Sequence, residues 1–517
     1  MDSGEGKTST DQTSGPESNL PDSGQDPKAS GPPKTTRSWW KRLTAGHAFH
    51  VLLHAIALIG GALIGLWVAE KVEREHENRH RRILIPVLIE GADRQGGQFA
   101  LGVSRAMEFA HRYRLDYIGD HQIEPWLLDE RMDATSLVQL IRAEDPPIIV
   151  GPLRSTPALQ LVPLLAKAKP DPTGSALGPL DTTYTASTSG AAAGAIDRNG
   201  LGIPVILGIP TNTQITQKAD LVWRLSPTDD AQGDFVAAAY VATIHPDGPA
   251  VMIEDLRPPG DGGNPTYTNG LKDRILRGVN DMKLEGYPAL EERAVRAQGA
   301  TSEVQQYLET RHPRTIIYVG MPDLAQDVLR LAQGPKAETD ATWLFTDSCI
   351  TSPEELIPRL KGMPGDFYIT FQAPPASVSK GLQQYMAYTV STGGNVLFAL
   401  DRQKECDRFL AAPSYEIFGF DSYLTALLVL RESKTGTRAA VIQKIRERTI
   451  TSPLLIGETY SFLPSGDREI KDDKNNKSNN TGFYLYEFKG GCTLYRSLDE
   501  LKAKRAAAAT AAAAPKP

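Results

Sequence analysis

Hydroxyl side chains and an arginine gather where a short apolar strand gives way to a helix. Residues 148–150 (Ile-Ile-Val) have the pattern of a buried strand, which a Gly-Pro pair interrupts. Arg154, Ser155 and Thr156 follow directly, and an apolar helical pattern begins near Pro157. A helix N-terminus presents free N–H groups and a partial positive charge, so this arrangement favours binding of an anion. The alternative is that Ser155 and Thr156 only cap the helix.

The elements that must position these side chains alternate between strand and helix. Apolar strand patterns occur at 83–90, 126–128, 148–150, 203–207, 251–255, 315–319 and 342–345, with helical patterns between most of them. Such alternation predicts parallel, doubly wound α/β sheets that bind ligands at the carboxyl ends of their strands. Roughly 400 residues of this pattern are too many for one sheet, so we expect two lobes with a cleft between them.

Composition and motifs exclude several functions. The 517-residue chain is 40% apolar and 23% charged with a net charge of −6, which argues against a nucleic-acid partner. Cys349, Cys406 and Cys492 form no C-x-x-C motif, and at most one disulfide can form among them, with the pairing open. His76 and His80 have metal-ligand spacing but lack a third ligand. No nucleophile elbow, zinc-protease motif or Walker loop is present, so we expect no catalytic residues, no cofactor and no metal.

The segment before the first strand predicts a membrane anchor. Residues 1–47 form a tail rich in Ser, Gly and Pro that cannot bury enough surface to order itself. Residues 48–69 contain an apolar run of about 21 residues, which is long enough for one transmembrane helix. Residues 70–82 predict a charged helical stalk with i,i+4 ion pairs. Basic residues on the two sides of the apolar run are nearly balanced, so the charge count does not decide its orientation.

Two other segments interrupt or end the alternating pattern. Residues 171–202 are a low-complexity insertion of Gly, Ala, Ser and Thr, which predicts a flexible loop. Residues 496–517 form an alanine-rich C-terminal tail. Neither segment carries a motif that predicts chemistry.

Several segments, taken in order, resemble a known family. They include IIVGPLRSTPALQLVPLLAKAK, LVWRLSPTDDAQGDFVAAAYV, TYTNGLKD, IIYVGMPDLAQDVLRLA and FGFDSYLTALLVL. The chain from roughly 83 to 494 resembles the type I periplasmic solute-binding proteins, specifically the leucine/isoleucine/valine-binding branch of ABC importer receptors. This resemblance implies two Rossmann-like lobes joined by a hinge. Lobe 1 would comprise 83–220 and 348–456, and lobe 2 would comprise 221–347 and 457–495.

The resemblance also implies how the first lobe would hold a ligand carboxylate. The matching positions are Ser155 and Thr156, with Arg154 beside them, and Thr211 and Thr213 in the second loop. Several neutral donors satisfy a buried carboxylate without importing a full opposite charge. For each hydroxyl, simple helix capping is the competing interpretation.

The second lobe would supply an aromatic side chain and an acid. Tyr267 falls at the position of the family's cleft aromatic residue, and Asp323 falls at the acid of its Pro-Glu pair. The resemblance implies that Asp323 binds the ammonium of an α-amino acid. The competing interpretation of Asp323 is a favourable charge in the first turn of the helix that opens at Pro322.

These observations favour a membrane-tethered solute receptor, with its binding domain outside the cytoplasm, that serves an ABC permease. The expected ligand is an amino acid or a related small molecule. Two alternatives stay open. One is a sensory ectodomain of the same fold that reports to a signalling partner, and the other is a ligand-responsive regulator on the inner face of the membrane.

Overall fold

The chain separates into two units, residues 1–78 and 79–517. The computed structural model describes residues 60–61, 64–68, 70–71, 82–91, 94–168, 200–243, 248–282, 289–333, 340–349, 360, 363–372, 374, 379–391, 414–447, 449–452, 455, 459–469, 482–489, 492–503 and 507.

In the first unit, most of the predicted membrane helix (48–69) and of the predicted stalk (70–82) lies outside the described residues, as does the tail 1–47. Residues 60–61, 64–68 and 70–71 are helical. Within the described part of the chain, no helix has both the length and the hydropathy required to cross a bilayer.

The first lobe of the second unit is built on a six-stranded sheet with the order β2-β3-β1-β4-β6-β8. Its strands are β1 (Arg82–Ile89), β2 (Tyr117–Ile118), β3 (His121–Asp129), β4 (Ile149–Val150), β6 (Val205–Leu207) and β8 (Val222–Arg224). All pairings are parallel except that of β2 with β3. Helices cover both faces of such a sheet, which explains why the strands are short buried apolar runs.

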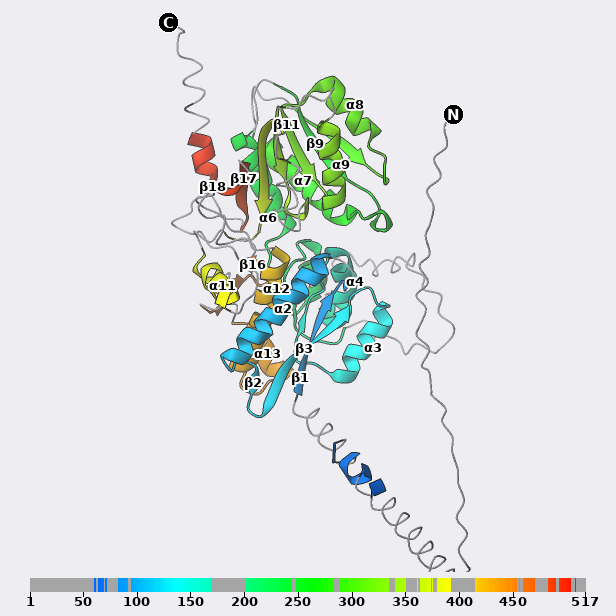
Figure 1. The fold of residues 1–517 in the computed structure, drawn as a ribbon, viewed down its shortest axis with the longest axis vertical. Helices are drawn as coiled ribbons and strands as arrows, with labels where there is room; N and C mark the ends of the chain where they lie inside the picture. Colours follow the sequence, from blue (N-terminus) through cyan, green and yellow to red (C-terminus); the bar gives the residue numbers. More distant parts are fainter. Residues whose placement is uncertain are drawn as a thin grey trace, which may run out of the picture. The chain divides into compact units, whose positions relative to one another are not determined.

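The second lobe is built on a seven-stranded sheet with the order β10-β9-β11-β12-β13-β17-β18. Its strands are β9 (Ala250–Asp255), β10 (Leu290–Val295), β11 (Thr315–Val319), β12 (Ala341–Phe345), β13 (Gly365–Phe371), β17 (Tyr484–Lys489) and β18 (Cys492–Arg496). The first five strands in the order run parallel, and β17 and β18 add an antiparallel edge. Figure 1 shows this sheet with α7 and α9 against it. The expected two-lobe α/β architecture is therefore confirmed.

Helices and short strands complete both lobes. The first lobe carries α2 (Arg94–Arg112), α3 (Ala134–Glu144), α4 (Ser155–Leu165), α5 (Gln214–Lys218), α12 (Ser414–Glu432) and α13 (Arg438–Ile445), and the second carries α6 (Asp229–Thr243), α7 (Pro265–Asp281), α8 (Ser302–Arg311) and α9 (Pro322–Ala332). The remaining elements are β5 (Lys167–Ala168), β7 (Ala219–Asp220), η1 (Pro259–Asp261), η2 (Asp347–Cys349), α11 (Lys380–Ser391), β14 (Thr449–Thr451), β15 (Thr459–Phe462) and β16 (Arg468–Glu469).

The chain changes lobes at points that differ from the expected boundaries. The first lobe was expected to end at 220, but β8 belongs to its sheet, so the crossing follows Arg224. It was expected to resume at 348, but β13 pairs with β12 and β17 in the second sheet. The second lobe was expected to resume at 457, but Gly466 accepts a hydrogen bond from the backbone of Arg224. Strand pairing, which depends on residues far away in sequence, decides these boundaries.

The C-terminal boundary also differs from expectation. Residues 498–503 are helical, and Leu498 and Leu501 are buried in the apolar core of the second lobe. The compact domain thus continues into the segment expected to be a tail from 496 onward. The insertion expected at 171–202 lies outside the described residues apart from its last three positions.

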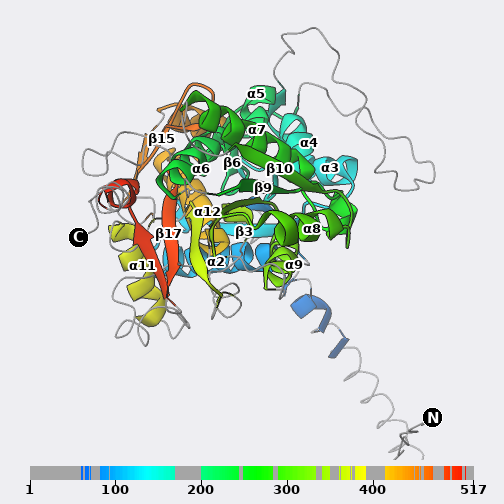
Figure 2. The ribbon, with the colours of Figure 1, turned by 90° about the horizontal axis from the view of Figure 1, so that it is seen from above.

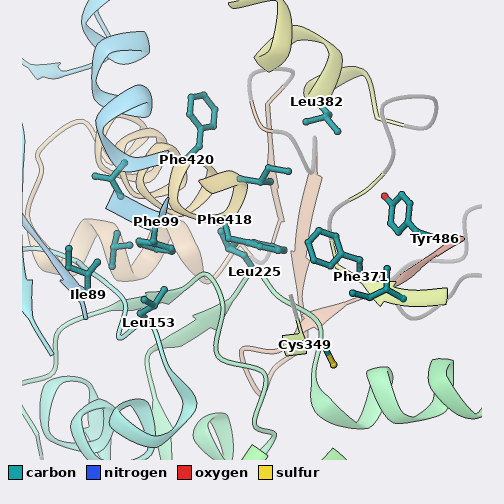
Figure 3. Packing of buried hydrophobic residues seen from close by; sticks show 14 of the residues in the cluster. Ile89, Phe99, Leu153, Leu225, Cys349, Phe371, Leu382, Phe418, Phe420 and Tyr486 are labelled. Atoms are coloured by element: carbon teal, nitrogen blue, oxygen red, sulfur yellow. The ribbon is translucent and has the colours of Figure 1, made fainter. Parts of the chain in front are cut away.

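One apolar cluster extends through both lobes (Figure 3). Ile89 and Phe99 belong to it in the first lobe, and Phe371 and Tyr486 belong to it in the second. In Figure 3, Phe99 of α2 lies beside Phe418 of α12. Helices α2 and α12 of the first lobe therefore pack in the same apolar core as the sheet of the second lobe.

Two glycines allow α2 and α12 to cross at backbone contact. The helices lie side by side in both ribbon views (Figures 1 and 2). A Cβ on Gly102 would come within 2.0 Å of the Glu416 carbonyl oxygen, and one on Gly419 within 2.2 Å of the Phe99 carbonyl oxygen. No side chain fits at either position, so glycine is needed for this close approach.

We expect Gly419→Ala to destabilise the protein by about 1–3 kcal/mol, because the added methyl must push two helix backbones apart. Thermal unfolding of the variant measures the loss. The matched control is Gly97→Ala, since a Cβ at Gly97 meets nothing within 4 Å. Equal melting temperatures for the two variants would contradict the close crossing.

Candidate functional site

A cavity lies between the two lobes, at the carboxyl ends of their strands. The volume of the cavity is about 50 Å³, which is room for a few water molecules or part of a small ligand. The lining residues are Gln95, Leu153, Arg154, Ser155, Ile209, Pro210, Thr211, Asn264, Tyr267, Met321, Asp347, Ser348, Gln372 and Tyr415. This is the location at which α/β sheets bind ligands.

The N-terminus of α4 points a hydroxyl at the cavity. The helix begins at Ser155, two residues earlier than the sequence pattern indicated, and its N-cap is Arg154, which makes no side-chain cap hydrogen bond. Ser155 is therefore the first helical residue rather than a cap. Its side chain is buried and lines the cavity.

Two carboxyl groups hold the turn that precedes α4. The Arg154 guanidinium pairs with Glu90, with Nε 2.6 Å from Oε2, so its charge is compensated although it lines the cavity. Glu130 Oε2 accepts a hydrogen bond from the Leu153 backbone N–H at 2.5 Å. Burial raises the pKa of Glu130 to about 8, although this backbone N–H bond opposes the shift. Both acids follow strands of the first sheet, at its carboxyl edge.

The predicted threonines have different surroundings. Thr211 lines the cavity, and its carbonyl oxygen accepts hydrogen bonds from Arg224 Nη1 at 2.6 Å and from the Asp229 backbone N–H at 2.8 Å. Thr213 lies outside the lining, and its hydroxyl donates to Asp230 Oδ2 at 3.2 Å.

Thr156 also lies outside the lining, but it links the two lobes. Its hydroxyl donates to Asn264 Oδ1 at 3.4 Å. Asn264 is the N-cap of α7 in the second lobe and itself lines the cavity. Thr156 therefore contacts the site's wall rather than the cavity.

Tyr267 lies in the first turn of α7 and lines the cavity with a nearly buried ring. Its hydroxyl donates to Asp347 Oδ1 at 2.9 Å and lies 3.3 Å from Gln232 Oε1. The tyrosine is thus held by its polar end, and its position next to an acid was not visible in the sequence.

Asp323 lies outside the cavity lining, in the first turn of α9. Both of its oxygens accept hydrogen bonds from Arg257, at 2.7 and 2.9 Å, and Arg257 also pairs with Asp255 at 2.7 Å. Partial burial acts to raise the pKa of Asp323, but hydrogen bonds and the charge of Arg257 hold it below its usual range. Its charge is already compensated within the protein.

Asp347 is the acid that the second lobe presents to the cavity, and the sequence analysis missed it. Gln232 Nε2 donates to Oδ1 at 2.6 Å, in addition to the Tyr267 hydroxyl, and Gln372 Nε2 donates to Oδ2. Burial raises the pKa of Asp347, while these hydrogen bonds oppose the shift. The available signal was its position two residues after the apolar strand β12, at the end of a strand where parallel sheets place ligand contacts.

Other lining residues missed in the sequence are amides and a tyrosine. Gln95 and Tyr415 are the second residues of α2 and α12, so the glycine crossing of these helices positions both side chains. Gln372 follows β13 and is 4% exposed. In the described part of the chain, no group of three or more His, Cys, Asp or Glu residues is arranged to hold a metal ion. The arrangement suits hydrogen bonding to a small polar molecule.

Comparisons of sequence give no match: no protein-family model matches the chain, and neither does any curated protein. Similarity is found in the solved structures. A leucine-binding protein from Thermotoga maritima has a TM-score of 0.55 and 17% identity over 80% of this chain and 97% of that protein. The substrate-binding protein of a branched-chain amino acid transporter from Streptococcus pneumoniae, in complex with isoleucine, has a TM-score of 0.54 and 14% identity over 80% and 99%.

A third structural neighbour binds a different kind of molecule. It is the solute-binding protein of an ABC transporter from Rhodopseudomonas palustris, in complex with 4-hydroxybenzoate, with a TM-score of 0.54 and 14% identity over 80% of this chain and 96% of that protein. The chain therefore has the two-lobe fold of ABC-transporter solute-binding proteins. That fold accommodates both aliphatic amino acids and aromatic acids.

Glu130→Gln should become increasingly more stable than the parent as the pH rises from about 4.5 to about 8. The folded parent retains a proton that the unfolded chain releases in this window, so its free energy of unfolding falls with pH. Glutamine has no such proton and keeps an oxygen for the Leu153 N–H. Melting temperatures of both proteins across this range provide the measurement, and a constant difference between them would contradict the raised pKa.

Proposed function

We propose that this chain is a membrane-tethered solute-binding protein that takes an amino acid or a related small molecule between its lobes and serves an ABC-type importer. One observation carries the proposal. Neutral donors of the first lobe and an acid of the second lobe line the same cavity, so one small molecule can contact both lobes at once. A ligand that contacts both lobes favours their closed arrangement.

The first-lobe wall suits a ligand carboxylate or another anionic group. Ser155 and Thr211 contribute hydroxyls, and α4 directs its N-terminus toward them. Hydroxyls and a helix N-terminus stabilise an anion without a full positive charge. Arg154 adds less, because Glu90 already neutralises its guanidinium.

The described lining favours binding over chemistry. It holds no histidine, cysteine or lysine that could act as a base or nucleophile toward a bound molecule. The hydroxyl of Ser348 donates to the Gly320 carbonyl oxygen at 2.9 Å, so it is not activated by a neighbouring base. We therefore assign a receptor role and no reaction.

The membrane tether rests on the first unit. Helical residues Ile64, Leu66 and Trp67 are each more than 60% exposed, and they belong to the long uncharged run of 48–69. Exposed apolar side chains on a helix are typical of a surface that contacts lipid or another protein. We place residues 79–517 outside the cytoplasm, where an importer receptor meets its solute.

The double variant Ser155→Ala/Thr211→Ala should bind amino acids at least tenfold more weakly, because each hydrogen bond to a charged group contributes about 1.5–3 kcal/mol. Isothermal titration against a panel of amino acids and small amides measures this, after a thermal-shift screen of the panel. Thr213→Ala serves as the control, since Thr213 lies outside the lining. Normal binding by the double variant would remove both hydroxyls from the site.

Protease added to intact cells or spheroplasts should digest residues 79–517, because the proposal places them outside the cytoplasm. Immunoblotting against the C-terminal domain gives the readout, and a cytoplasmic protein controls for lysis. Digestion only after lysis would exclude the importer role and favour a regulator on the inner face of the membrane.

A further inference from the structure

We propose that Glu130 is a positioning residue that links the binding of an anionic ligand to a proton: the first-lobe wall holds the anion while Glu130 is neutral, and affinity falls when Glu130 ionises. This inference rests on the proposed function, since it assigns a regulation to the same cavity. It concerns the groups behind the first-lobe wall rather than those that touch the ligand.

Glu130 lies directly behind the turn that opens α4. Its Oε2 accepts a hydrogen bond from the Leu153 backbone N–H at 2.5 Å, and the Arg154 backbone N–H is a second donor that favours its ionised form. Leu153, Arg154 and Ser155 all line the cavity. The Glu130 carboxyl therefore binds the same short backbone segment from the protein side that a ligand contacts from the cavity side.

One helix N-terminus is thus shared by two acidic groups. The partial positive charge of α4 is confined to its first turn, which begins at Ser155. An ionised Glu130 would draw on that charge from behind, and a ligand anion would draw on it from the front. Two like charges so placed in a poorly hydrated site repel one another. The anion of the ligand and the ionised form of Glu130 therefore compete.

Burial keeps Glu130 neutral when no ligand is bound. The residue is 4% exposed, and its Oε1 has no hydrogen-bond partner among the described residues. Burying an ionised carboxylate with an unpartnered oxygen is costly, whereas burying a neutral carboxyl costs much less. Burial raises the pKa of Glu130 to about 8 accordingly. Near neutral pH the wall behind Ser155 therefore carries no charge from this acid.

The charged groups on the elements around Glu130 are occupied by other partners. They are Glu90, Asp129, Arg131, Asp133 and Arg154. Arg154 pairs with Glu90 at 2.6 Å, and Arg131 pairs with Asp129 at 2.9 Å. Asp133 accepts the backbone N–H of Ser136 as the N-cap of α3. The charges of Arg154 and Glu90 act on the pKa of Glu130 in opposite directions, and burial outweighs both.

The direction of the linkage follows from these contacts. A bound anion disfavours the ionised form of Glu130, so it raises the pKa of Glu130 above the ligand-free value of about 8. Below about pH 7 the acid is neutral with or without ligand, and affinity is constant. As the pH rises through 8, the free protein loses a proton that the complex keeps, so binding takes up a proton and weakens.

The test measures affinity against pH for the full-length chain in mild detergent. Titration calorimetry with isoleucine and with benzoate covers the range from about pH 6.5 to about pH 9, in which both carboxylates stay ionised. Benzamide is the uncharged counterpart of benzoate. We expect affinity for each carboxylate to fall about three- to tenfold across this range, and that for benzamide to stay constant.

Proton uptake gives a second readout that a purely structural role of Glu130 would not change. Titrations in buffers of different ionisation enthalpy give the number of protons bound with each ligand. We expect a fraction of a proton per carboxylate near pH 8 and none near the acidic end of the range.

Glu130→Gln keeps an oxygen for the Leu153 N–H but cannot ionise, so it should abolish both the fall in affinity and the proton uptake. The matched control is Asp129→Asn. A hydrogen bond from Arg131 holds the pKa of Asp129 below its usual range, so this variant should keep the parent's pH profile. Melting temperatures without ligand identify any variant that fails to fold.

Two other buried acids near the cavity are rival sources of a pH dependence. Burial raises the pKa of Asp229 to about 7 and also raises that of Asp347. Asp229→Asn and Asp347→Asn, made one at a time, should each retain the weakening of binding near pH 8.

The outcomes separate this inference from the proposed function. Carboxylate binding with constant affinity across the pH range would overturn the inference and keep the solute receptor. A pH dependence that survives in Glu130→Gln but disappears in Asp229→Asn or Asp347→Asn would overturn the assignment to Glu130. Affinity that increases with pH would contradict the sign of the linkage. If no compound of the screened panel binds the parent at any pH, the proposed function fails, and this inference fails with it.

Discussion

The buried guanidinium of Arg224 is the interaction on which the site depends. It ends β8, where the chain leaves the first lobe, and its side chain has no exposed area. It donates to the carbonyl oxygens of Thr211 and Asn212 at 2.6 and 2.8 Å, and it pairs with Asp467 at 3.3 Å. A buried charge persists only where such partners surround it. The Arg224 side chain thereby joins the loop at Thr211 and Asn212, which lies beside the cavity, to the turn at Asp467. The chain returns to the second lobe after this turn.

Charge compensation also distinguishes the acids around the cavity. Arginines compensate Glu90, Asp255, Asp323 and Asp467, whereas Asp347 is held by neutral amides and a tyrosine hydroxyl. The charge of each paired acid is compensated within the protein. An acid without a countercharge keeps the capacity to select a ligand by its charge. Burial raises the pKa of Asp347, and its hydrogen bonds from Gln232, Tyr267 and Gln372 oppose that shift.

The fold joins its two lobes through several chain crossings. The chain passes between the lobes after β8, after β13 and after β16, so any motion of one lobe against the other would move whole sheets rather than single loops. Solved structures of the same fold bind isoleucine or 4-hydroxybenzoate at 14% identity to this chain. Proteins of the same fold thus bind different ligands, and the residues that line each binding site determine which ligand is bound.

The sequence by itself determined the two-lobe α/β fold, because strand and helix periodicity is a local property of the chain. The strand-to-helix turn at Ser155 was visible in the sequence, and the family resemblance pointed to Thr211 and Tyr267; all three line the cavity. Only the tertiary structure decided which acid faces the cavity. Asp323 is neutralised by Arg257, 66 positions earlier in the chain, and Asp347 is joined by side chains from α6, α7 and the end of β13. Compensation of charge depends on which distant side chains fold together, and that information is not contained in the spacing of residues along the chain.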